Sequence, residues 1–364
     1  MDPENRRRQP SVLPAVPEVI RTIKKERLVY AWRLPFAPLD ICMNKTYHEL
    51  HDFSSTGKER PWQEKKNKSL IVSESFKRLG NLKRASKIHE CGTFLEFKQF
   101  SDKTLKLHLA NFCKARLCPM CAWRRSLKIY GQLSQIIEQV QKMGDYAFLF
   151  LTLTVKNCGE CELKETIDDM LKGYDRFFKK PAIKKVILGA YRALEVTHNT
   201  DEKSKSFDTF HPHFHIILAV KKSYFKSKDY LSSSQISELW QSCIKADYSP
   251  IVDIRRITED KFKGIEHAVA ETAKYTVKDD DYIIQEDENL MDKTIFVLDD
   301  ALRGRRLISF RGIFKEAAEI LKLDDAIDGD LVHVGDDPER DDAYKIVKYC
   351  WNKDWLNYFL TGGD

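Results

Sequence analysis

No stretch of this 364-residue chain is apolar and uncharged over the roughly 18–20 residues that a membrane-spanning helix needs. The N-terminus, MDPENRRRQP, has no apolar run behind it, so the pattern of a secretory signal is missing. Internal repeats are missing as well, which argues against a repeat architecture. We therefore expect a soluble, cytoplasmic protein that has no membrane partner.

Cysteine is present in an odd number, nine, and its spacing is uneven. In a cytosolic chain, closely spaced cysteines are more often metal ligands than disulfide partners. Hydrophobic residues make up 42% of the chain, and its length suits one large domain or two ordinary ones.

Charge is distributed unevenly along the chain. The first 130 residues carry 27 Lys/Arg against 13 Asp/Glu, whereas the rest carries 34 against 42. A basic front part fits a polyanionic partner, although a solvated charged surface would have the same composition. The acidic stretches at 279–281 and 324–342 argue against a protein that coats DNA with its whole surface.

Hydrophobic patterning predicts four segments. An extended, proline-containing leader spans 1–65, a basic cysteine-rich segment 66–130, a mixed domain 131–323 and an acidic, aromatic segment 324–364. Within them, apolar spacing predicts helices at 124–143, 167–178, 264–278 and 313–323, a helix capped by Ser234, and strands at 147–155, 190–197, 213–220, 252–257 and 306–310. The loop 198–209 suits an antiparallel hairpin, so we expect an α+β fold with a central antiparallel sheet flanked by helices.

The motif HPHFHIIL at 211–218 is the strongest chemical signal. His213 and His215 are two apart on a predicted strand, so both imidazoles point to one face and Phe214 points into the core. Because Pro212 cannot donate to a ladder, we expect the strand to begin after it. Two imidazoles on one face can share a metal ion, and the alternative is a histidine pair on a solvated sheet face.

A third ligand is expected from the neighbouring strand. Glu195 in RALEVTHN can face back across the hairpin toward the two histidines. A carboxylate with two imidazoles suits Mg²⁺ or Mn²⁺ when phosphate oxygens complete the shell. The alternative is a surface carboxylate.

A second signal is the segment HAVAETAKYTVKDDDY at 267–282. On a helix, Glu271 and Tyr275 share one face, with Lys278 three residues further on and His267 four residues before Glu271. A tyrosine that attacks a phosphodiester needs help to ionise, and a lysine and a metal ion both favour the phenolate. A carboxylate can later activate water. The alternative is an ordinary amphipathic helix with a polar pair.

Cysteine spacing gives the third signal, in CGTFLEF…NFCKARLCPMCAWRR. It predicts a tetrahedral Zn²⁺ site, surrounded by cations that would face a phosphate backbone. The expected zinc ligands are Cys91, Cys113, Cys118 and Cys121, and the expected DNA-contacting cations are Arg116, Arg124, Arg125 and Lys128. A second Cys-x₂-Cys, formed by Cys158 and Cys161, could instead complete a site with Cys118 and Cys121, and free buried cysteines are the remaining alternative.

Taken together, these pieces resemble the rolling-circle plasmid replication initiators (Rep proteins) of the HUH endonuclease superfamily, and most closely the single-tyrosine family of Gram-positive plasmids. The resemblance covers about Cys91 to Leu323. The matching pieces occur in the family's order: CPMCAWRRSLK, FLTLTVKN, RALEVTHN, PHFHIIL, ETAKYTVKD and GRRLISFRGIFKEA.

The resemblance implies a bacterial cytoplasmic enzyme with a nicking domain over 131–323. His213 and His215 match the metal-binding histidines, Tyr275 the nicking tyrosine and Glu271 the carboxylate that releases the strand. The implied reaction leaves a 5′-phosphotyrosyl link and a 3′-OH primer. The implied partners are origin DNA with a single-stranded nick-site loop, a host helicase and a host polymerase, and a homodimer is left open.

Two other functions also fit parts of the sequence. A histidine-triad nucleotide hydrolase would use His211, His213 and His215 without a metal ion and would give Tyr275 no role. A non-enzymatic, zinc-dependent DNA-binding regulator would bind DNA without cutting it.

Overall fold

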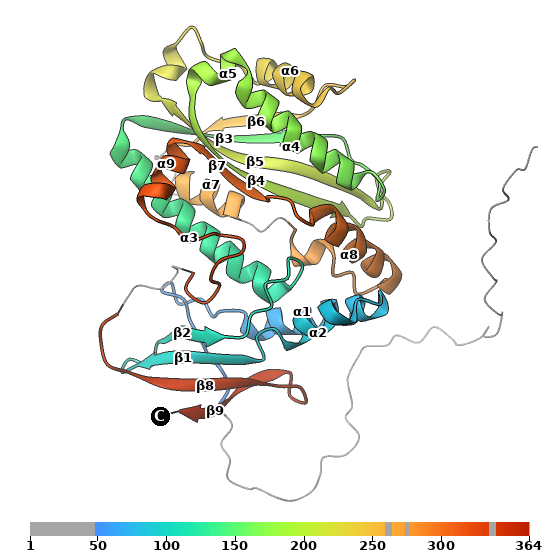
Figure 1. Ribbon diagram of the computed structural model, residues 1–364, viewed down its shortest axis with the longest axis vertical. Helices are drawn as coiled ribbons and strands as arrows, with labels where there is room; N and C mark the ends of the chain where they lie inside the picture. Colours follow the sequence, from blue (N-terminus) through green and yellow to red (C-terminus); the bar gives the residue numbers. More distant parts are fainter. Residues whose placement is uncertain (1–47, 259–263, 274–276, 335–339, 364) are drawn as a thin grey trace, which may run out of the picture. The chain divides into compact units, whose positions relative to one another are not determined.

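The computed structural model describes residues 48–258, 264–273, 277–334 and 340–363. Its larger sheet has five strands in the order β6-β3-β5-β4-β7, and every neighbouring pair is antiparallel (Figure 1). The strands are β3 (Tyr146–Thr154), β4 (Ile187–Asn199), β5 (Thr209–Lys221), β6 (Val252–Arg256) and β7 (Ile308–Gly312). The expected α+β class is confirmed, and the β4–β5 hairpin lies at the centre of the sheet.

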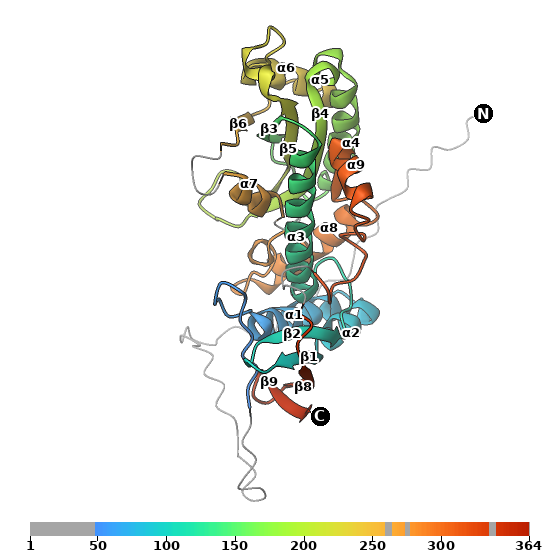
Figure 2. The same cartoon turned by 90° about the vertical axis from the view of Figure 1, so that its left-hand side faces the viewer.

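Helices cover both faces of this sheet (Figures 1 and 2). Phe214 and Ile216 of β5 share a core with α4 and α6, whereas Ile217 and Ala219 share a second core with α3, α7 and α9. One layer comprises α4 (Leu163–Lys179), α5 (Pro181–Val186) and α6 (Ser233–Ile244), and the other α3 (Pro119–Met143), α7 (Gly264–Ala273) and α9 (Ile313–Ile320). The odd-numbered side chains of β5, which include His213 and His215, therefore face the layer that contains α7.

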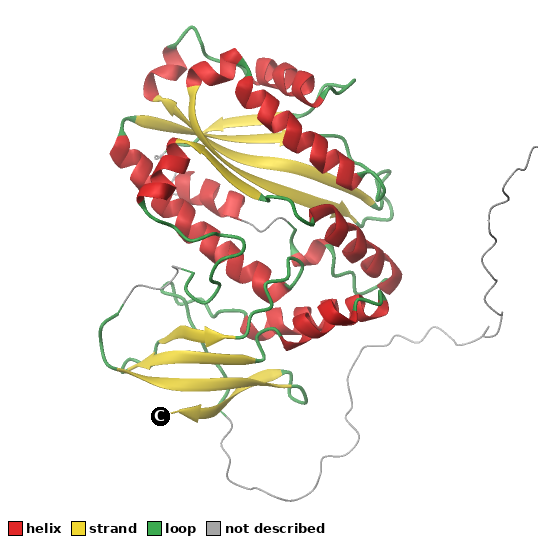
Figure 3. Ribbon diagram, in the orientation of Figure 1, coloured by secondary structure: helices red, strands yellow, loops and turns green. Residues whose placement is uncertain are grey.

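A smaller antiparallel sheet, drawn in yellow below the larger one in Figure 3, has the strand order β2-β1-β8-β9. Trp62 of the first helix contacts Phe97 of this sheet edge to face, with ring centroids 5.8 Å apart. The elements of this part are α1 (Trp62–Arg78), α2 (Leu82–Glu90), β1 (Phe94–Phe100), β2 (Leu105–Ala110), β8 (Tyr344–Asn352) and β9 (Asn357–Gly363), and the rest of the chain adds η1 (Lys222–Lys226), η2 (Asp279–Asp281) and α8 (Glu288–Leu302).

The structure differs from the predicted segment boundaries. Helix α3 runs without a break through the predicted boundary at 130/131, because its apolar positions repeat at helical spacing from Ile129 to Val140. The C-terminal segment 324–364 is not separate, since β8 pairs with β1 along its length. Part of the predicted leader is also structured: Arg60 donates to buried Asp52, and α1 begins at Trp62.

Three local predictions need correction. Strand β5 begins at Thr209 and so includes Pro212. The strand tolerates this proline because the ladder to β3 ends at His213, and Pro212 pairs only with β4. Helix α6 is capped by Ser232 in a capping box with Gln235, not by Ser234. The helix predicted over 264–278 does not extend to its expected end, since Val277 and Lys278 are not helical. Among the described helices, none is long and apolar enough to cross a membrane.

Candidate functional site

Three predicted metal ligands meet on the face of the large sheet that α7 covers. Glu195 on β4 lies directly opposite His213 on β5, and the alternation of strand side chains brings His215 to the same face. The Glu195 Oε2 atom is 3.0 Å from His215 Nε2 and 3.5 Å from His213 Nε2. The three ligand atoms lie within 4.8 Å of one another. One carboxylate and two imidazoles at this spacing fit a divalent cation with open coordination positions.

The ring nitrogen of each histidine that does not face Glu195 makes a further contact, which holds the ring in orientation. His213 Nδ1 is 3.0 Å from the carbonyl oxygen of His211, and His215 Nδ1 is 3.3 Å from the Thr152 hydroxyl on β3. Such outer contacts fix the ring orientation of metal-binding histidines. The role of Thr152 was not predicted, because the β3–β5 pairing is not visible in local sequence.

The charge on Glu195 is stabilised although the side chain is only 5% exposed. Burial by itself raises the pKa of Glu195, but hydrogen bonds and charge interactions with His213 and His215 outweigh burial and hold the pKa well below its ordinary value. Lys278 Nζ lies 3.1 Å from Glu195 Oε1. The carboxylate therefore stays ionised, as a metal ligand must be.

A cavity of about 530 Å³ opens beside this cluster. Its lining includes His215, Glu271 of α7, and the exposed cations Arg255 and Arg256 of β6. Glu271 Oε1 is 3.9 Å from His267 Nε2, as the i,i+4 spacing predicted. The sequence did not lead us to predict Arg255 and Arg256 as cavity residues. The only sequence feature that could have indicated them is the pair of arginines that follows VDI.

The predicted nucleophile, Tyr275, lies outside the described residues, four positions after Glu271 in the sequence. The prediction that Lys278 continues the helical face of Glu271 is wrong, because Lys278 is extended (φ −70°, ψ 145°) and precedes the short helix η2. Lys278 reaches the site by its ion pair with Glu195 instead.

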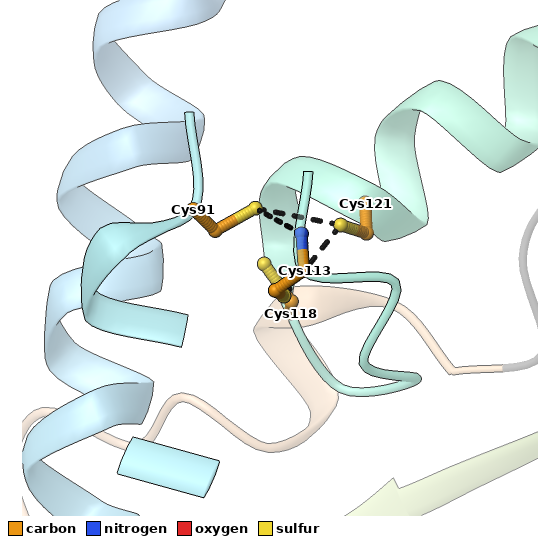
Figure 4. A group of neighbouring side chains, drawn as sticks. All are labelled: Cys91, Cys113, Cys118 and Cys121. Atoms are coloured by element: carbon orange, nitrogen blue, oxygen red, sulfur yellow. Dashed lines mark hydrogen bonds between the residues drawn. The ribbon is translucent and has the colours of Figure 1, made fainter. Parts of the chain in front are cut away.

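The four predicted zinc ligands also meet (Figure 4). Cys91, Cys113, Cys118 and Cys121 place their sulfur atoms within 4.8 Å of one another, with Sγ–Sγ distances of 3.4 Å between Cys91 and Cys121 and 3.7 Å between Cys113 and Cys121. Four thiolates around Zn²⁺ at Zn–S distances of about 2.3 Å would be spaced similarly. The donor set therefore fits a tetrahedral, closed metal site.

Two further observations favour these four cysteines as the metal ligands. Fully buried Lys66 donates to the carbonyl oxygens of His89 (2.5 Å) and Cys91 (2.8 Å), so its amine nitrogen lies beside the thiols. The alternative set is not assembled: the Cys158 sulfur is 3.6 Å from the Phe210 carbonyl oxygen, and Cys161 is exposed.

The expected DNA-contacting cations of α3 are not surface residues, contrary to the prediction. Arg124, Arg125 and Lys128 are at most 3% exposed. Arg124 donates to Leu331 and Val332 carbonyls, Arg125 to those of Ile327, Ala115 and Lys114, and Lys128 to Asp324 and the Asp330 carbonyl. These cations hold the 324–332 segment onto α3. Arg116, which is half-buried, donates to the Leu302 carbonyl at 2.5 Å.

Comparison with known proteins decides the family. The Rep_1 family, described as "Replication protein", matches residues 104–359, which is more than half of the chain. The chain belongs to this family. The match covers both groups of candidate metal ligands apart from Cys91, and it confirms the resemblance to rolling-circle plasmid Rep proteins.

Relatives of this replication protein agree over most of its length. A "Protein rep" from Bacillus amyloliquefaciens is 41% identical over 340 residues, covering 86% of this chain and 98% of the relative. A "Protein rep" from Streptococcus pneumoniae serotype 2 (strain D39 / NCTC 7466) is 38% identical over 316 residues, covering 85% and 95%. No solved structure matches the chain. The comparisons support plasmid replication initiation as the broad function and give no support to a histidine-triad hydrolase.

Proposed function

We propose that this replication protein starts rolling-circle replication by nicking one strand of its plasmid origin through Tyr275. The observation that carries the proposal is the Glu195–His213–His215 cluster, whose member His215 lines the same cavity as Glu271. In the sequence, Glu271 precedes Tyr275 by four residues, the spacing of side chains that share one helical face. A regulator that only binds DNA would have no use for this arrangement.

The reaction follows from the residues around the cavity. Tyr275 gives up its phenol proton and attacks phosphorus in line, the bond from phosphorus to the 3′ oxygen breaks, and that oxygen takes up a proton to become the 3′-OH primer. The 5′ phosphate stays joined to the tyrosine. Arg255 and Arg256 bind the flanking phosphates. Mg²⁺ or Mn²⁺ held by His213, His215 and Glu195 would supply Lewis-acid polarisation of the scissile phosphate.

The four-cysteine centre holds Zn²⁺, because a set of four thiols, three of them buried, prefers this ion to Mg²⁺ or Mn²⁺. The origin is engaged as an extruded single-stranded loop, and a host helicase and polymerase extend the primer.

The test is an incubation of the full chain with Mn²⁺ or Mg²⁺ and a supercoiled plasmid that carries the protein's own coding region. We expect open circles and protein attached to a 5′ end, both lost with a chelator and in His213→Ala. Binding without any cleavage under either metal would support a DNA-binding regulator instead.

Replacing Glu271 by alanine should separate cleavage from release. Nicking continues because Tyr275 and the metal ligands remain, but hydrolysis of the phosphotyrosyl bond slows by about 10²- to 10⁴-fold, since no carboxylate activates water. The covalent adduct therefore accumulates, which denaturing gel electrophoresis of a labelled origin fragment measures. Glu266→Ala, an exposed carboxylate on the same helix, is the matched control. Release at the wild-type rate in Glu271→Ala would remove Glu271 from the mechanism.

A further inference from the structure

The short turn that follows Tyr275 in the sequence is held between two parts of the molecule. The turn comprises residues 277–282 and contains η2. On one side, Lys278 forms the ion pair with Glu195 on β4. On the other side, Asp279 and Asp280 face helix α1 of the part that contains the four-cysteine centre. The turn therefore connects the two candidate metal sites.

The contact with α1 is a short ion-pair network. Lys65 Nζ is 2.6 Å from Asp279 Oδ2, and Lys68 Nζ is 3.3 Å from the same oxygen and 2.8 Å from Asp280 Oδ1. The side chains of Lys65 and Asp279 are only 17% and 14% exposed, so water screens this pair weakly. Although burial opposes the charge of Asp279, its contacts with the two lysines hold the pKa of this carboxyl below its usual value. Asp279 is thus held ionised, and its contact with Lys65 is geometrically defined.

A second attachment joins the same turn to the cysteine loop. Tyr282 is fully buried, and its hydroxyl donates to the carbonyl oxygen of Leu117 at 3.2 Å. Leu117 directly precedes the predicted zinc ligand Cys118. Val277, at the start of the turn, is 2% exposed, so both ends of the turn are anchored in the core.

We propose that Lys65 and Lys68 of α1, together with Tyr282, fix the turn 277–282 and so hold Lys278 against Glu195. These residues touch neither DNA nor metal in this role; they are positioning residues, and the inference rests on the proposed nicking function. The cysteine-containing part of the protein therefore contributes to strand cleavage by fixing the turn after the nucleophile. A misplacement of about 1 Å at a reacting group can slow a reaction about 10²-fold.

The test replaces both lysines by methionine, which keeps most of the side-chain length and removes the charge. In Lys65→Met/Lys68→Met we expect single-turnover cleavage of a labelled origin strand to slow by about 10- to 100-fold, with unchanged affinity for origin DNA. Lys65→Arg keeps a cation and should cleave at close to the wild-type rate. Lys77→Met is the matched control, because this exposed lysine of α1 pairs only with Glu74 among the contacts described.

A readout that does not depend on cleavage is the affinity for Mn²⁺, measured by electron paramagnetic resonance. Lys278→Met removes the cation from Glu195 directly and should tighten Mn²⁺ binding. If the turn holds Lys278 in place, the double lysine variant shifts the Mn²⁺ affinity in the same direction. A structural defect would instead weaken Mn²⁺ binding.

The outcomes separate the two proposals. Wild-type cleavage and Mn²⁺ affinity in the double variant overturn the positioning role and leave the nicking function intact. A joint fall of cleavage, origin binding and Mn²⁺ affinity also overturns it, because that pattern reports general unfolding. If the wild-type protein makes no adduct, the nicking function fails, and the shift in Mn²⁺ affinity alone decides whether α1 positions Lys278.

Discussion

Replacing Tyr275 by phenylalanine is expected to abolish origin nicking, with a loss of at least about 10³-fold in the single-turnover rate. Phenylalanine keeps the ring but removes the only atom that can form the phosphotyrosyl bond. Conversion of supercoiled plasmid to open circles, and labelling of the protein through its 5′ adduct, measure the loss. Affinity for origin DNA should stay close to wild type, because the substitution changes no charge.

The control for this prediction is Tyr130→Phe, which alters an exposed tyrosine on α3. It should nick like the wild type. If Tyr275→Phe still yields open circles and a covalent adduct, the nucleophile is another residue, and mass spectrometry of the attached peptide would identify it.

Replacing Cys118 by serine is expected to remove Zn²⁺ and unfold the part of the protein built on α1, α2 and the small sheet. Structural zinc sites contribute apparent binding free energies of about 10–16 kcal/mol, and a hydroxyl does not replace a thiolate as ligand. The cluster would also retain three thiols beside the buried Lys66 side chain without a metal ion to organise them. Metal content by elemental analysis and the midpoint of thermal unfolding measure the effect.

Cys161→Ser is the matched control, since Cys161 belongs to the second Cys-x₂-Cys pair and is exposed. It should keep one Zn²⁺ per chain and an unchanged unfolding midpoint. Retention of zinc in Cys118→Ser, with loss in Cys161→Ser, would show that the metal uses the alternative set of cysteines.

Local sequence patterns were sufficient to predict the arrangement of the candidate metal ligands on the large sheet. Strand alternation is a property of the backbone, so HPHFH places His213 and His215 on one face wherever the strand lies. The hairpin length similarly brings Glu195 opposite His213. In both cases the residues are close in sequence, and their geometry depends on short-range rules.

Long-range contacts explain what the sequence did not predict. A run of basic residues can either bind DNA at the surface or form buried hydrogen bonds within the protein. Arg125 is buried and donates to Ile327 because the 324–332 segment, some two hundred residues later in the chain, covers α3. The pairing of β1 with β8 joins segments about as distant in the chain. The local sequence of one segment does not indicate which distant segment will pack against it, since such contacts depend on which surfaces the whole fold buries together.

The sequence by itself determined the α+β class, the two sets of candidate metal ligands and the order of motifs that points to a replication protein, because each depends on residue type and on spacing within one or two neighbouring elements. Only the tertiary structure decided which cations are buried, that Arg255 and Arg256 line the cavity beside His215, and that α1 holds the turn after Tyr275. Those features arise where elements distant in the chain pack together, and packing partners are selected by the burial and charge pairing of the complete fold.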